Sequence, residues 1–503
     1  MDRRSFGQSL AGLLAASSLP SWGVAKTPIG DHASFVAALE EKPWLLGYLG
    51  TRDIALEASI TRATGRIPQG FEGDFFRNGP AFHSIGNDRF SHWFDAPGMV
   101  QRFRFRGGQV AHQGRLIETA RNRAEVAAGA IQYSGFGTHG HGLGTGGSAD
   151  AQNTANINLI DHAGELLALW EGGSAHIVDP EDLTTTGRKI WSEDTNGLPF
   201  GAHPRKDRDG TLWNLGYSVN PAALVLYRIS ATGELRNTHI LPQLAVPMVH
   251  DFMITESKII IVAPPFSSSG PNNQAFVDLF EWKDSESVRI FVLDKDDPTQ
   301  IVTLETDPFW VFHFGNAYDI SPTEIGFDFA QHDHPGFMTH DAYAAMDGSW
   351  DGSASAASRY VQATLDLREK RVRLERASEI GSAEFIQTDP RAQLQSHRYT
   401  LLLSKPARPE VYGYGRLVLV DRMKSQTAHF DVNETEMLEE HLIVPKPGDD
   451  EGFWILGTSL DWAKGQSALS IYDGLSLSDG PLYRADLDLA LPLGLHGRFL
   501  PMT

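Results

Sequence analysis

"VQRFRFRGGQVAHQGRLIE", residues 100–118, holds two short runs of strand-forming residues with Gly107 and Gly108 between them. A Gly-Gly pair between two such runs favours a tight hairpin turn. We therefore expect residues 100–118 to form two paired antiparallel strands.

The same pattern recurs from residue 70 onward. Short β-rich runs alternate with Gly, Pro and Asp-Gly turn signals, as in "GELLALWEGGSAHIVDPEDL" (164–183), "GTLWNLGYSV" (210–219), "SKIIIVAPP" (257–265), "SVRIFVLDKDD" (287–297) and "YGRLVLVDRM" (414–423). Helical periodicity is scarce, and residues 34–48 and 341–347 are the better candidates for helices.

The number of strands decides the fold class. So many short strands over roughly 430 residues exceed what one sandwich holds, and they suit a β-propeller with four-stranded blades of roughly 40 to 65 residues. Seven blades fit that length, although no internal repeat is clean enough to prove the count. No low-complexity linker marks a second domain. We predict an all-β fold, a seven-bladed β-propeller that forms a single domain over residues 26–503.

Composition excludes several classes of function. The 503-residue chain carries a net charge of −20, which argues against a nucleic-acid partner and against adhesion to anionic lipid. It contains no cysteine, so thiolate catalysis, Fe–S clusters, Cys-ligated zinc and disulfides are excluded. Metal chemistry would have to use His, Asp and Glu. The sequence does not indicate an oligomeric state.

The first 25 residues have the features of a targeting segment. Arg3 and Arg4 precede Ser5-Phe6, a short apolar run follows, and "GVA" before Lys26 offers a small-residue cleavage site. The run is too short to span a bilayer, and the whole resembles a twin-arginine export signal, although Asp2 and Gly7-Gln8 depart from its usual pattern. This predicts a signal peptide over residues 1–25 and a periplasmic or secreted protein. The alternative is an N-terminal tail on a cytoplasmic protein.

Four of the 19 histidines share one setting: a Gly, Pro or Asp residue at a strand end, and apolar neighbours. They are His203 in "GAHPRKDRDG", His250 in "VPMVHDFMIT", His313 in "FHFGNAYD" and His496 in "PLGLHGRFLP". Spacings of 47, 63 and 183 residues exclude a local motif such as H-E-x-x-H, but suit strands of different blades that converge on one axis. Four neutral imidazoles would suit iron, copper or zinc. For any one of them, chemistry alone favours a satisfied buried histidine.

Other histidines lie in short polar tracts. His139 and His141 fall in the glycine-rich "GTHGHGLGTGG", and His332 and His334 in "AQHDHPG". We interpret the first pair as part of a solvated loop and the second as a polar turn, rather than as metal ligands.

The segments around the four spaced histidines resemble the carotenoid cleavage oxygenase family, which includes the retinal-pigment-epithelium and lignostilbene-type oxygenases. "GDFFRNGPAF" (73–82) and "HWFDAPGMVQRFRF" (92–105) resemble early family motifs, with Ala96 in place of a common glycine. The similarity continues through the four histidine segments in the family's order and covers nearly the whole mature chain. It implies a seven-bladed propeller with a dome of loops and short helices over an apolar tunnel. It also implies one axial Fe²⁺ per chain, held by His203, His250, His313 and His496.

The resemblance also implies three glutamates that orient the histidines. Glu171, Glu384 and Glu440 match these positions, although Glu439 could take the place of Glu440. A carboxylate on the far N–H of a ligating imidazole fixes its tautomer and raises its basicity. Three carboxylates cannot serve four imidazoles, so we expect one histidine to have a different partner.

The activity that the resemblance implies is dioxygenase cleavage of a carbon–carbon double bond to two carbonyl products. This reaction needs O₂ and a redox-active ion, which zinc is not, and it needs no protein acid, base or nucleophile. A propeller that only binds a lipophilic ligand, a zinc hydrolase and an isomerase are the alternatives.

The substrate is expected to be an apolar conjugated molecule. We expect Trp93, Phe94, Trp310 and Phe312 to line the tunnel, with core packing as the alternative for each. Stilbene-cleaving relatives use an early Tyr and Lys pair, but here no lysine occurs between Lys42 and Lys189, and the tyrosine region reads "GRLIETARNR". This favours an apocarotenoid or carotenoid over a phenolic stilbene, unless Arg121 or Arg123 substitutes for the lysine.

The stretch "PPFSSSGPNNQAFVDLFEW" (264–282) carries four apolar residues in a Gly/Pro/Ser-rich context: Phe266, Phe276, Leu279 and Phe280. In relatives such a loop dips into a membrane beside the tunnel mouth and collects lipophilic substrate. The alternative is a loop that folds back on the dome, and the sequence leaves both interpretations open.

Overall fold

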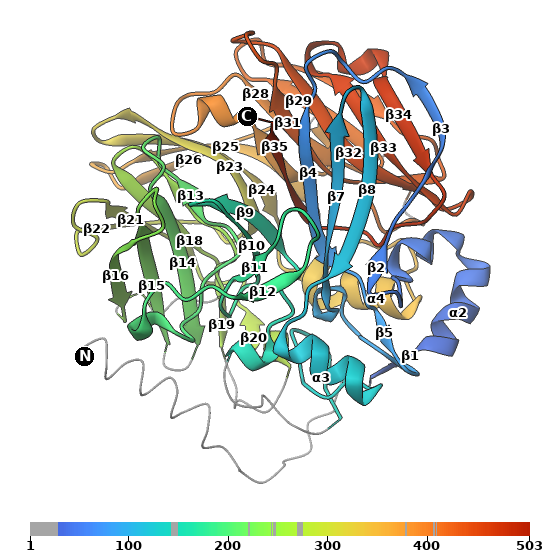
Figure 1. Cartoon of the computed structure of the whole chain (residues 1–503). Helices are drawn as coiled ribbons and strands as arrows, with labels where there is room; N and C mark the ends of the chain where they lie inside the picture. Colours follow the sequence, from blue (N-terminus) through green and yellow to red (C-terminus); the bar gives the residue numbers. More distant parts are fainter. Residues whose placement is uncertain are drawn as a thin grey trace.

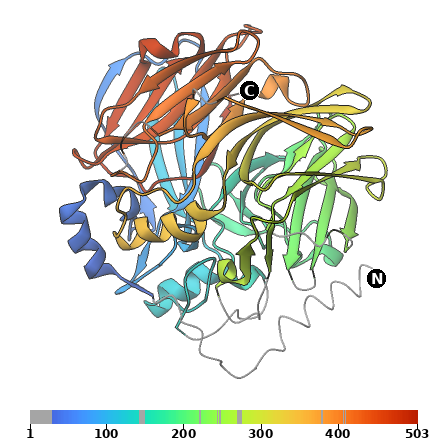
Figure 2. The same cartoon turned by 180° about the vertical axis from the view of Figure 1, so that it is seen from behind.

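The computed structural model describes residues 29–141, 149–219, 222–242, 244, 248–268, 275–377, 380–405, 408 and 410–502. The predicted signal peptide, residues 1–25, lies outside the described residues. Seven antiparallel sheets stand around a common axis, as Figures 1 and 2 show from opposite sides. The prediction of an all-β, seven-bladed propeller is confirmed.

We number the blades 1 to 7 and give their strands from the axis outward. Blade 1 contains β35 (His496–Pro501), β4 (Gly73–Pro80), β7 (Gly98–Arg106), β8 (Gln109–Leu116) and β2 (Ala55–Leu56). Blade 2 contains β9 (Asn158–His162), β10 (Glu165–Leu169), β11 (His176–Val178) and β12 (Thr185–Arg188). Blade 3 contains β13 (Arg205–Lys206), β14 (Leu212–Val219), β15 (Ala222–Ile229) and β16 (Leu235–Leu241).

The second half of the ring repeats this order. Blade 4 contains β17 (Met253–Ile254), β18 (Lys258–Ala263), β21 (Val288–Asp294) and β22 (Ile301–Thr306). Blade 5 contains β23 (Trp310–Ser321), β24 (Glu324–His332), β25 (Ser358–Asp366) and β26 (Arg371–Arg376). Blade 6 contains β27 (Glu384–Thr388), β28 (Tyr399–Ser404), β29 (Arg416–Asp421) and β30 (Gln426–Asp431). Blade 7 contains β31 (Glu436–Pro445), β32 (Phe453–Asp461), β33 (Gln466–Asp473), β34 (Pro481–Leu487) and β3 (Ile60–Gly65).

The two ends of the chain close the ring. The C-terminal strand β35 pairs with β4, with His496 opposite Asn78, so it becomes the inner strand of blade 1. The early strand β3 pairs with β34 on the outer edge of blade 7. Closure removes the open edge that a seven-sheet array would otherwise present. It also places His496, near the end of the chain, on the central axis.

The hairpin predicted at residues 100–118 is formed by β7 and β8. Gly107 and Gly108 connect them with φ of 57° and 72°, and a two-residue turn of this type needs positive φ at both positions. Phe103 and Phe105 are fully buried against blade 7. The Gly-Gly pair between two β-rich runs therefore predicted the hairpin correctly.

Short helices and loops gather at one end of the propeller, the lower end in Figure 1, and form the expected dome. They are α2 (His32–Glu41), η1 (Pro43–Tyr48), η2 (Trp93–Asp95), α3 (Ala120–Ala128), η3 (Ala149–Gln152), η5 (Phe276–Leu279), η6 (Phe337–Asp341) and α4 (Ala342–Asp347). Two small sheets join them, made of β1 (Gly30–Asp31), β5 (Ser84–Ile85) and β6 (Asp88–Arg89), and of β19 (Phe266–Ser268) and β20 (Phe280–Trp282). Three further turns, η4 (Glu193–Thr195), η8 (Pro390–Ala392) and η9 (Gly474–Asp479), connect strands.

The predicted helices at 34–48 and 341–347 correspond to α2 with η1 and to α4. The sequence pattern missed α3, because its buried residues include Arg121, Asn122 and Glu125 rather than an apolar stripe. No helix in the described part of the chain is long and apolar enough to cross a bilayer.

Candidate metal centre

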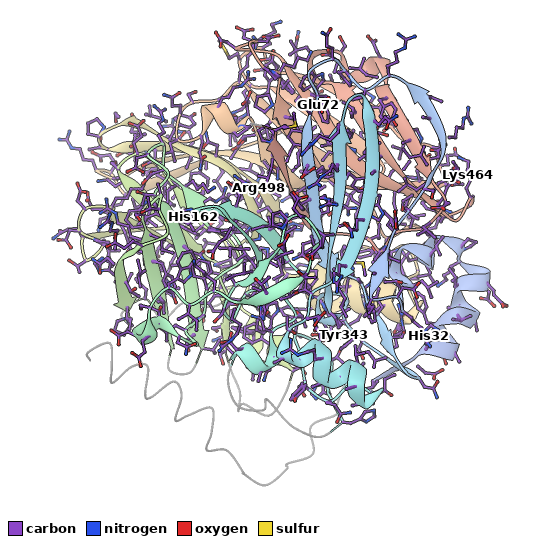
Figure 3. All side chains as sticks on the ribbon, viewed as in Figure 1. His32, Glu72, His162, Tyr343, Lys464 and Arg498 are labelled. Carbon is purple, nitrogen blue, oxygen red and sulfur yellow. The ribbon has the colours of Figure 1, made fainter. Side chains whose placement is uncertain are left out.

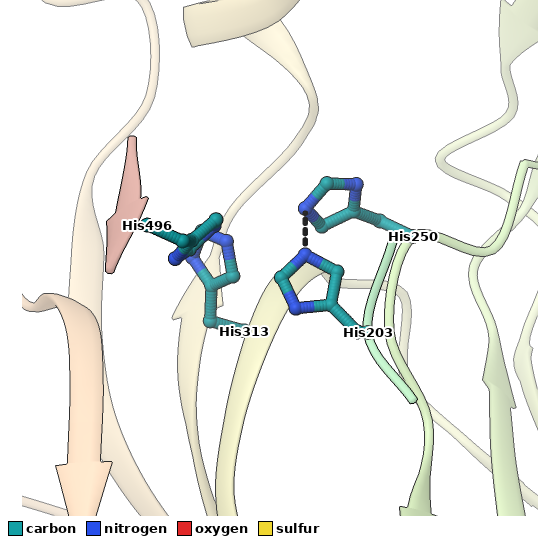
Figure 4. A group of neighbouring side chains, drawn as sticks. All are labelled: His203, His250, His313 and His496. Carbon is teal, nitrogen blue, oxygen red and sulfur yellow. Dashed lines mark hydrogen bonds between the residues drawn. The ribbon is translucent and has the colours of Figure 1, made fainter. Parts of the chain in front are cut away.

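Four histidines from the inner strands of four blades meet on the axis. His203 lies two residues before β13, His250 lies three residues before β17, His313 lies within β23, and His496 opens β35. Their candidate ligand nitrogens all lie within 4.8 Å of one another. Figure 4 shows the four rings turned toward a common point. Residues up to 293 positions apart in the chain are therefore brought together by the ring of blades.

A bulge in β23 directs His313 to the axis. Pairing of β23 with β24 is irregular between Val311 and Phe314, and again between Phe314 and Ala317. Such bulges re-aim side chains that a regular strand would point elsewhere. Gly315 permits the close approach that follows, since a Cβ there would lie 2.4 Å from the buried Asp328 Oδ1.

A buried ion pair ties three of these inner strands together. The Asp251 carboxylate accepts hydrogen bonds from Arg205 Nη2 at 2.5 Å and from the Phe314 backbone N–H at 3.1 Å. Arg205 Nε in turn donates to the Phe252 carbonyl at 2.9 Å. Asp251 is adjacent to His250, Phe314 to His313, and Arg205 lies two residues after His203, so the pair fixes the spacing of three imidazoles. The sequence analysis did not single out Asp251 or Arg205.

Three carboxylates hold the far nitrogens of three imidazoles. His313 Nδ1 donates to Glu384 at 2.5 Å, His496 Nδ1 donates to Glu440 at 2.8 Å, and His250 Nδ1 contacts Glu171. Each contact leaves the Nε2 lone pair of its ring free to face the axis. Glu171 follows β10 in blade 2, Glu384 opens β27 in blade 6, and Glu440 lies on β31 in blade 7. Each of the seven blades therefore contributes one histidine or one glutamate.

The choice between Glu439 and Glu440 is settled by their opposite directions on β31. Glu439 pairs with Arg77 in the core and accepts from Thr458 Oγ1 at 2.9 Å and from the Gly494 backbone N–H. Glu440, by contrast, lies 2.8 Å from His496 Nδ1, so it is the residue that orients this imidazole.

His203 is the histidine without a carboxylate. Among the described residues, none of the three glutamates contacts it, and its Nε2 lies 2.9 Å from His250 Nε2. Burial lowers the pKa of His203 and of His250 well below the ordinary value, and the neighbouring imidazoles act in the same direction. Both rings are thereby held neutral, which is the form that binds a metal.

Glu384 has a different effect on His313. Burial alone would lower the pKa of His313, but the charge and hydrogen bond of Glu384 raise it overall. Burial would raise the pKa of Glu384, but His313 and His332 lower it overall. Glu384 is thus an ionised hydrogen-bond acceptor shared by two imidazoles.

His332 corrects one sequence interpretation. It is not part of a polar turn: it ends β24, is buried, and its Nε2 lies 2.8 Å from Glu384 Oε1. His139 is also buried and contacts Asp278 at 2.8 Å, whereas His141 is exposed as expected. His334 lies in the turn that follows β24.

The donor set fits a divalent transition metal. His313 Nε2 is buried and has no hydrogen-bond partner among the described residues, so this polar atom is satisfied only by a ligand on the axis. Imidazoles are ligands for iron, copper, zinc and nickel, and carboxylates on their far nitrogens are the usual support.

The centre opens onto a cavity of about 290 Å³ with mostly apolar walls that include many aromatic side chains. Trp93, Phe94 and Phe312 line it as predicted, whereas Trp310 packs behind Phe312, 5.3 Å between ring centroids, and is fully buried in the core. The core-packing alternative is therefore correct for Trp310. Further aromatic residues of the lining, which no sequence motif indicated, are Tyr48, Phe136, Trp170, Tyr217, Phe337, Phe385, Tyr412 and Tyr414.

The four apolar residues of the stretch 264–282 point inward. Phe266 and Phe280 stack at 5.0 Å and are buried, and Phe276 and Leu279 of η5 line the cavity. Residues 269–274 lie outside the described residues. These four side chains therefore adopt the alternative arrangement, in which the stretch folds back on the dome, and contact with a membrane stays a prediction.

Neither candidate arginine replaces the missing early lysine. Arg121 is buried and paired with Glu125 at 3.1 Å within α3, and Arg123 is exposed. Neither lines the cavity.

A closed seven-bladed propeller with four imidazoles and three carboxylates on its axis defines a class of β-propeller enzymes with a histidine-built centre. Residues 51–501 match the model of the family described as retinal pigment epithelial membrane protein, and the chain belongs to this family. It is the family that the sequence motifs indicated.

Similar proteins carry oxygenase names. The carotenoid isomerooxygenase of Galleria mellonella is 26% identical over 89% of this chain and 94% of its own length. The isoeugenol monooxygenase of Pseudomonas nitroreducens is 26% identical over 91% and 98%. Among solved structures, cobalt-substituted apocarotenoid oxygenase of Synechocystis superposes with a TM-score of 0.82 at 23% identity, covering 92% of this chain and 99% of that one. The chain is thus an oxygenase, and the prediction of a dioxygenase that cleaves a double bond is confirmed.

Proposed function

We propose that the four imidazoles hold one Fe²⁺ per chain and that the enzyme uses O₂ to split a double bond of a lipophilic conjugated substrate into two carbonyl products. The observation that carries this proposal is the axial cluster: four ligand nitrogens within 4.8 Å, three of the rings held by carboxylates, at the wall of an aromatic cavity. Ferrous iron, when bound, supplies the activation of O₂ that zinc cannot.

The residues of the chain then have three tasks. Glu171, Glu384 and Glu440 fix the tautomers of their histidines, so that the Nε2 atoms face the axis. Phe312 and Phe385 pack on His250 and His313, at 4.8 and 5.5 Å, and exclude water from the centre. The aromatic walls bind the conjugated chain and fix its position along the cavity. None of these tasks requires a protein acid or base at the scissile bond.

We favour an apocarotenoid-type substrate because the cavity walls are mostly apolar and the early part of the chain lacks the lysine of stilbene-cleaving relatives. The apocarotenoid-15,15'-oxygenase of Synechocystis is 29% identical over 55% of this chain and 59% of its own. Cleavage of a phenolic double bond is the second candidate, since relatives include isoeugenol monooxygenase and the resveratrol cleavage oxygenase 1 of Aspergillus fumigatus, 23% identical over 92% of this chain.

The test is reconstitution of metal-free protein with Fe²⁺ under anaerobic conditions, followed by O₂ uptake with panels of apocarotenals and hydroxystilbenes. We expect one O₂ consumed per double bond cleaved and aldehyde products by mass spectrometry, with label from ¹⁸O₂ in both products. Zinc-loaded protein is the control and should be inactive. Substrate binding without O₂ uptake would support a ligand-binding propeller instead, and a rearranged substrate without cleavage would support an isomerase.

We also propose that residues 1–25 direct export by the twin-arginine route, which leaves residues 26–503 as the mature protein. Replacement of Arg3 and Arg4 by lysine should retain the full-length protein in the cytoplasm of a bacterial host. Unchanged fractionation of that variant would instead support an uncleaved tail.

A further inference from the structure

One cationic side chain of the cavity takes no part in the centre. Lys405 directly follows β28 and lines the same cavity as His313. Its Nζ lies over the ring of Tyr412 at 5.0 Å and over that of Tyr414 at 5.7 Å. Among the described residues, no hydrogen bond or ion pair involves this ammonium. Pro406, Ala407 and Pro409, which follow Lys405 closely in the chain, have no acidic side chain that could pair with it.

The lack of a carboxylate partner is unusual for a lysine in such surroundings. Lys295 also lies over an aromatic ring, that of Trp213 at 5.7 Å, but it pairs with Asp207 at 2.5 Å. Asp341 is the acid whose charge Lys405 feels, yet it is not within ion-pair distance and instead accepts from the Ser355 backbone N–H. A partly desolvated cation without a partner costs free energy, and an anionic ligand in the cavity would offset this cost.

No acid in the described lining of the cavity forms an ion pair with Lys405. Glu171 and Glu384 are engaged by His250 and His313, and Glu439 by Arg77. Lys405 is the only lysine or arginine in the described lining of the cavity. Its two tyrosine contacts are attractive but do not replace a counter-ion.

Aromatic rings connect Lys405 to the metal centre. Tyr414, under the ammonium, packs edge-on against Phe385 at 5.8 Å, and Phe385 stacks on His313 at 5.5 Å. A flat conjugated chain that starts at Lys405 would follow this row of rings and reach the histidines. Phe94, Phe136 and Phe276 form a second aromatic group of the lining, which contacts Phe312 through Phe94 and suits an apolar terminus.

We propose that Lys405 binds an oxyanion at one terminus of the substrate, a carboxylate or a phenolate, and so sets which double bond lies beside the centre. This inference rests on the proposed function. It gives the bound substrate a fixed direction in the cavity, with its anionic end at Tyr412 and Tyr414 and its apolar end at Phe276. Blade 6 would thus supply the cavity with a lysine, which the early part of the chain does not.

Equilibrium binding without O₂ tests the proposal independently of turnover. The probes are all-trans-retinoic acid against its methyl ester, and a hydroxystilbene against its methoxy analogue, followed by quenching of tryptophan fluorescence. The wild-type protein should bind the charged or hydroxylated member of one pair roughly 10- to 100-fold more tightly. Lys405→Met should abolish this preference, and Lys405→Arg should keep most of it.

Lys464→Met is the matched control. Lys464 is a half-exposed lysine paired with Asp461, and Figure 3 shows it at the outer edge of the molecule, away from the axis. This variant should keep the wild-type preference. A thermal midpoint for Lys405→Met no lower than that of the wild type shows that it folds, as expected when an unpaired cation is removed.

The outcomes distinguish a carboxylate ligand from a phenolate ligand. They also distinguish failure of the role of Lys405 from failure of the proposed function. Preference in the acid pair identifies a carboxylate, and preference in the stilbene pair identifies a phenolate. No preference in either pair, or a preference that survives in Lys405→Met, overturns the role of Lys405. Absence of O₂ uptake by iron-loaded protein would instead overturn the proposed function, whatever the binding result.

Discussion

The three glutamates of the centre differ in how firmly they are held. Glu440 accepts from His496, from Gln387 Nε2 at 2.8 Å and from the Gly497 backbone N–H at 2.8 Å. Glu384 is held by His313, by His332 and by its neighbour's N–H, whereas Glu171 Oε2 has no hydrogen-bond partner among the described residues. A carboxylate held from several sides fixes its imidazole, because it cannot rotate away.

Glu384→Gln should weaken metal binding. The amide keeps the volume but lacks the charge and can accept through only one oxygen, so His313 and His332 lose their shared acceptor. We expect a loss of roughly 10- to 100-fold in metal affinity. Competition with a chelator, read by metal analysis of the protein, measures it. Retention of wild-type affinity would contradict the orienting role.

Glu439→Gln provides the contrast. Glu439 is buried with Arg77 and does not contact the centre, so its loss leaves a buried cation unpaired. We expect a loss of about 3 kcal/mol in the free energy of unfolding, with metal affinity of the folded protein unchanged. Glu440→Gln should show the reverse, with weak metal binding and a smaller loss of stability. Denaturant titration and metal analysis of both variants decide between the two residues.

At the scale of elements, the centre depends on how β13, β17 and β23 are aligned. Two of these strands are only two residues long, so their own ladders cannot fix the positions of His203 and His250. The Asp251 and Arg205 pair supplies the missing constraint across the three blades. The sequence could not indicate this pair, because an Asp and an Arg 46 positions apart have no recognisable pattern.

Asp251→Asn should therefore act on both stability and metal binding. It removes the charge that holds Arg205 and weakens the hydrogen bond of the Phe314 N–H, and we expect a loss of about 3 kcal/mol in the free energy of unfolding. The metal affinity should also fall, although Asp251 is not a ligand. Spectra of the cobalt-loaded variant should show a changed coordination geometry. An unchanged cobalt spectrum would mean that the alignment has another source.

At the scale of the whole molecule, the sequence predicted what is periodic and missed what depends on three-dimensional packing. The short β-rich runs and the Gly107-Gly108 turn indicated the blades, and the histidine segments indicated the axial cluster. Trp310 was misassigned because a bulged strand does not keep its alternation, so neighbouring aromatic residues can face the cavity or the core. His332 was misassigned, and the stretch 264–282 was left open, because polar or Gly-rich composition does not reveal a buried partner.

The whole propeller should lose stability in acid through histidines far from the axis. Burial lowers the pKa of His112 to about 3, aided by Arg77, and burial lowers that of His176 to about 4, against Asp150. Below the ordinary value of 6.5 the unfolded chain binds protons that the folded protein does not, so stability falls as pH falls from 6.5 toward these values. Each histidine should contribute about 1.4 kcal/mol per pH unit.

His112→Asn tests this linkage without disturbing the centre. The Asn side chain can replace Nδ1 as the acceptor of the Ala58 N–H, which His112 binds at 3.0 Å, but it cannot take up a proton. Denaturant titrations between pH 6 and pH 4 should give a pH dependence of the unfolding free energy that is shallower than wild type by about 1.4 kcal/mol per pH unit. Any acid release of metal is common to both proteins and cancels in the difference. Equal slopes would show that His112 is protonated in the folded protein, and that acid sensitivity has its origin elsewhere in the propeller.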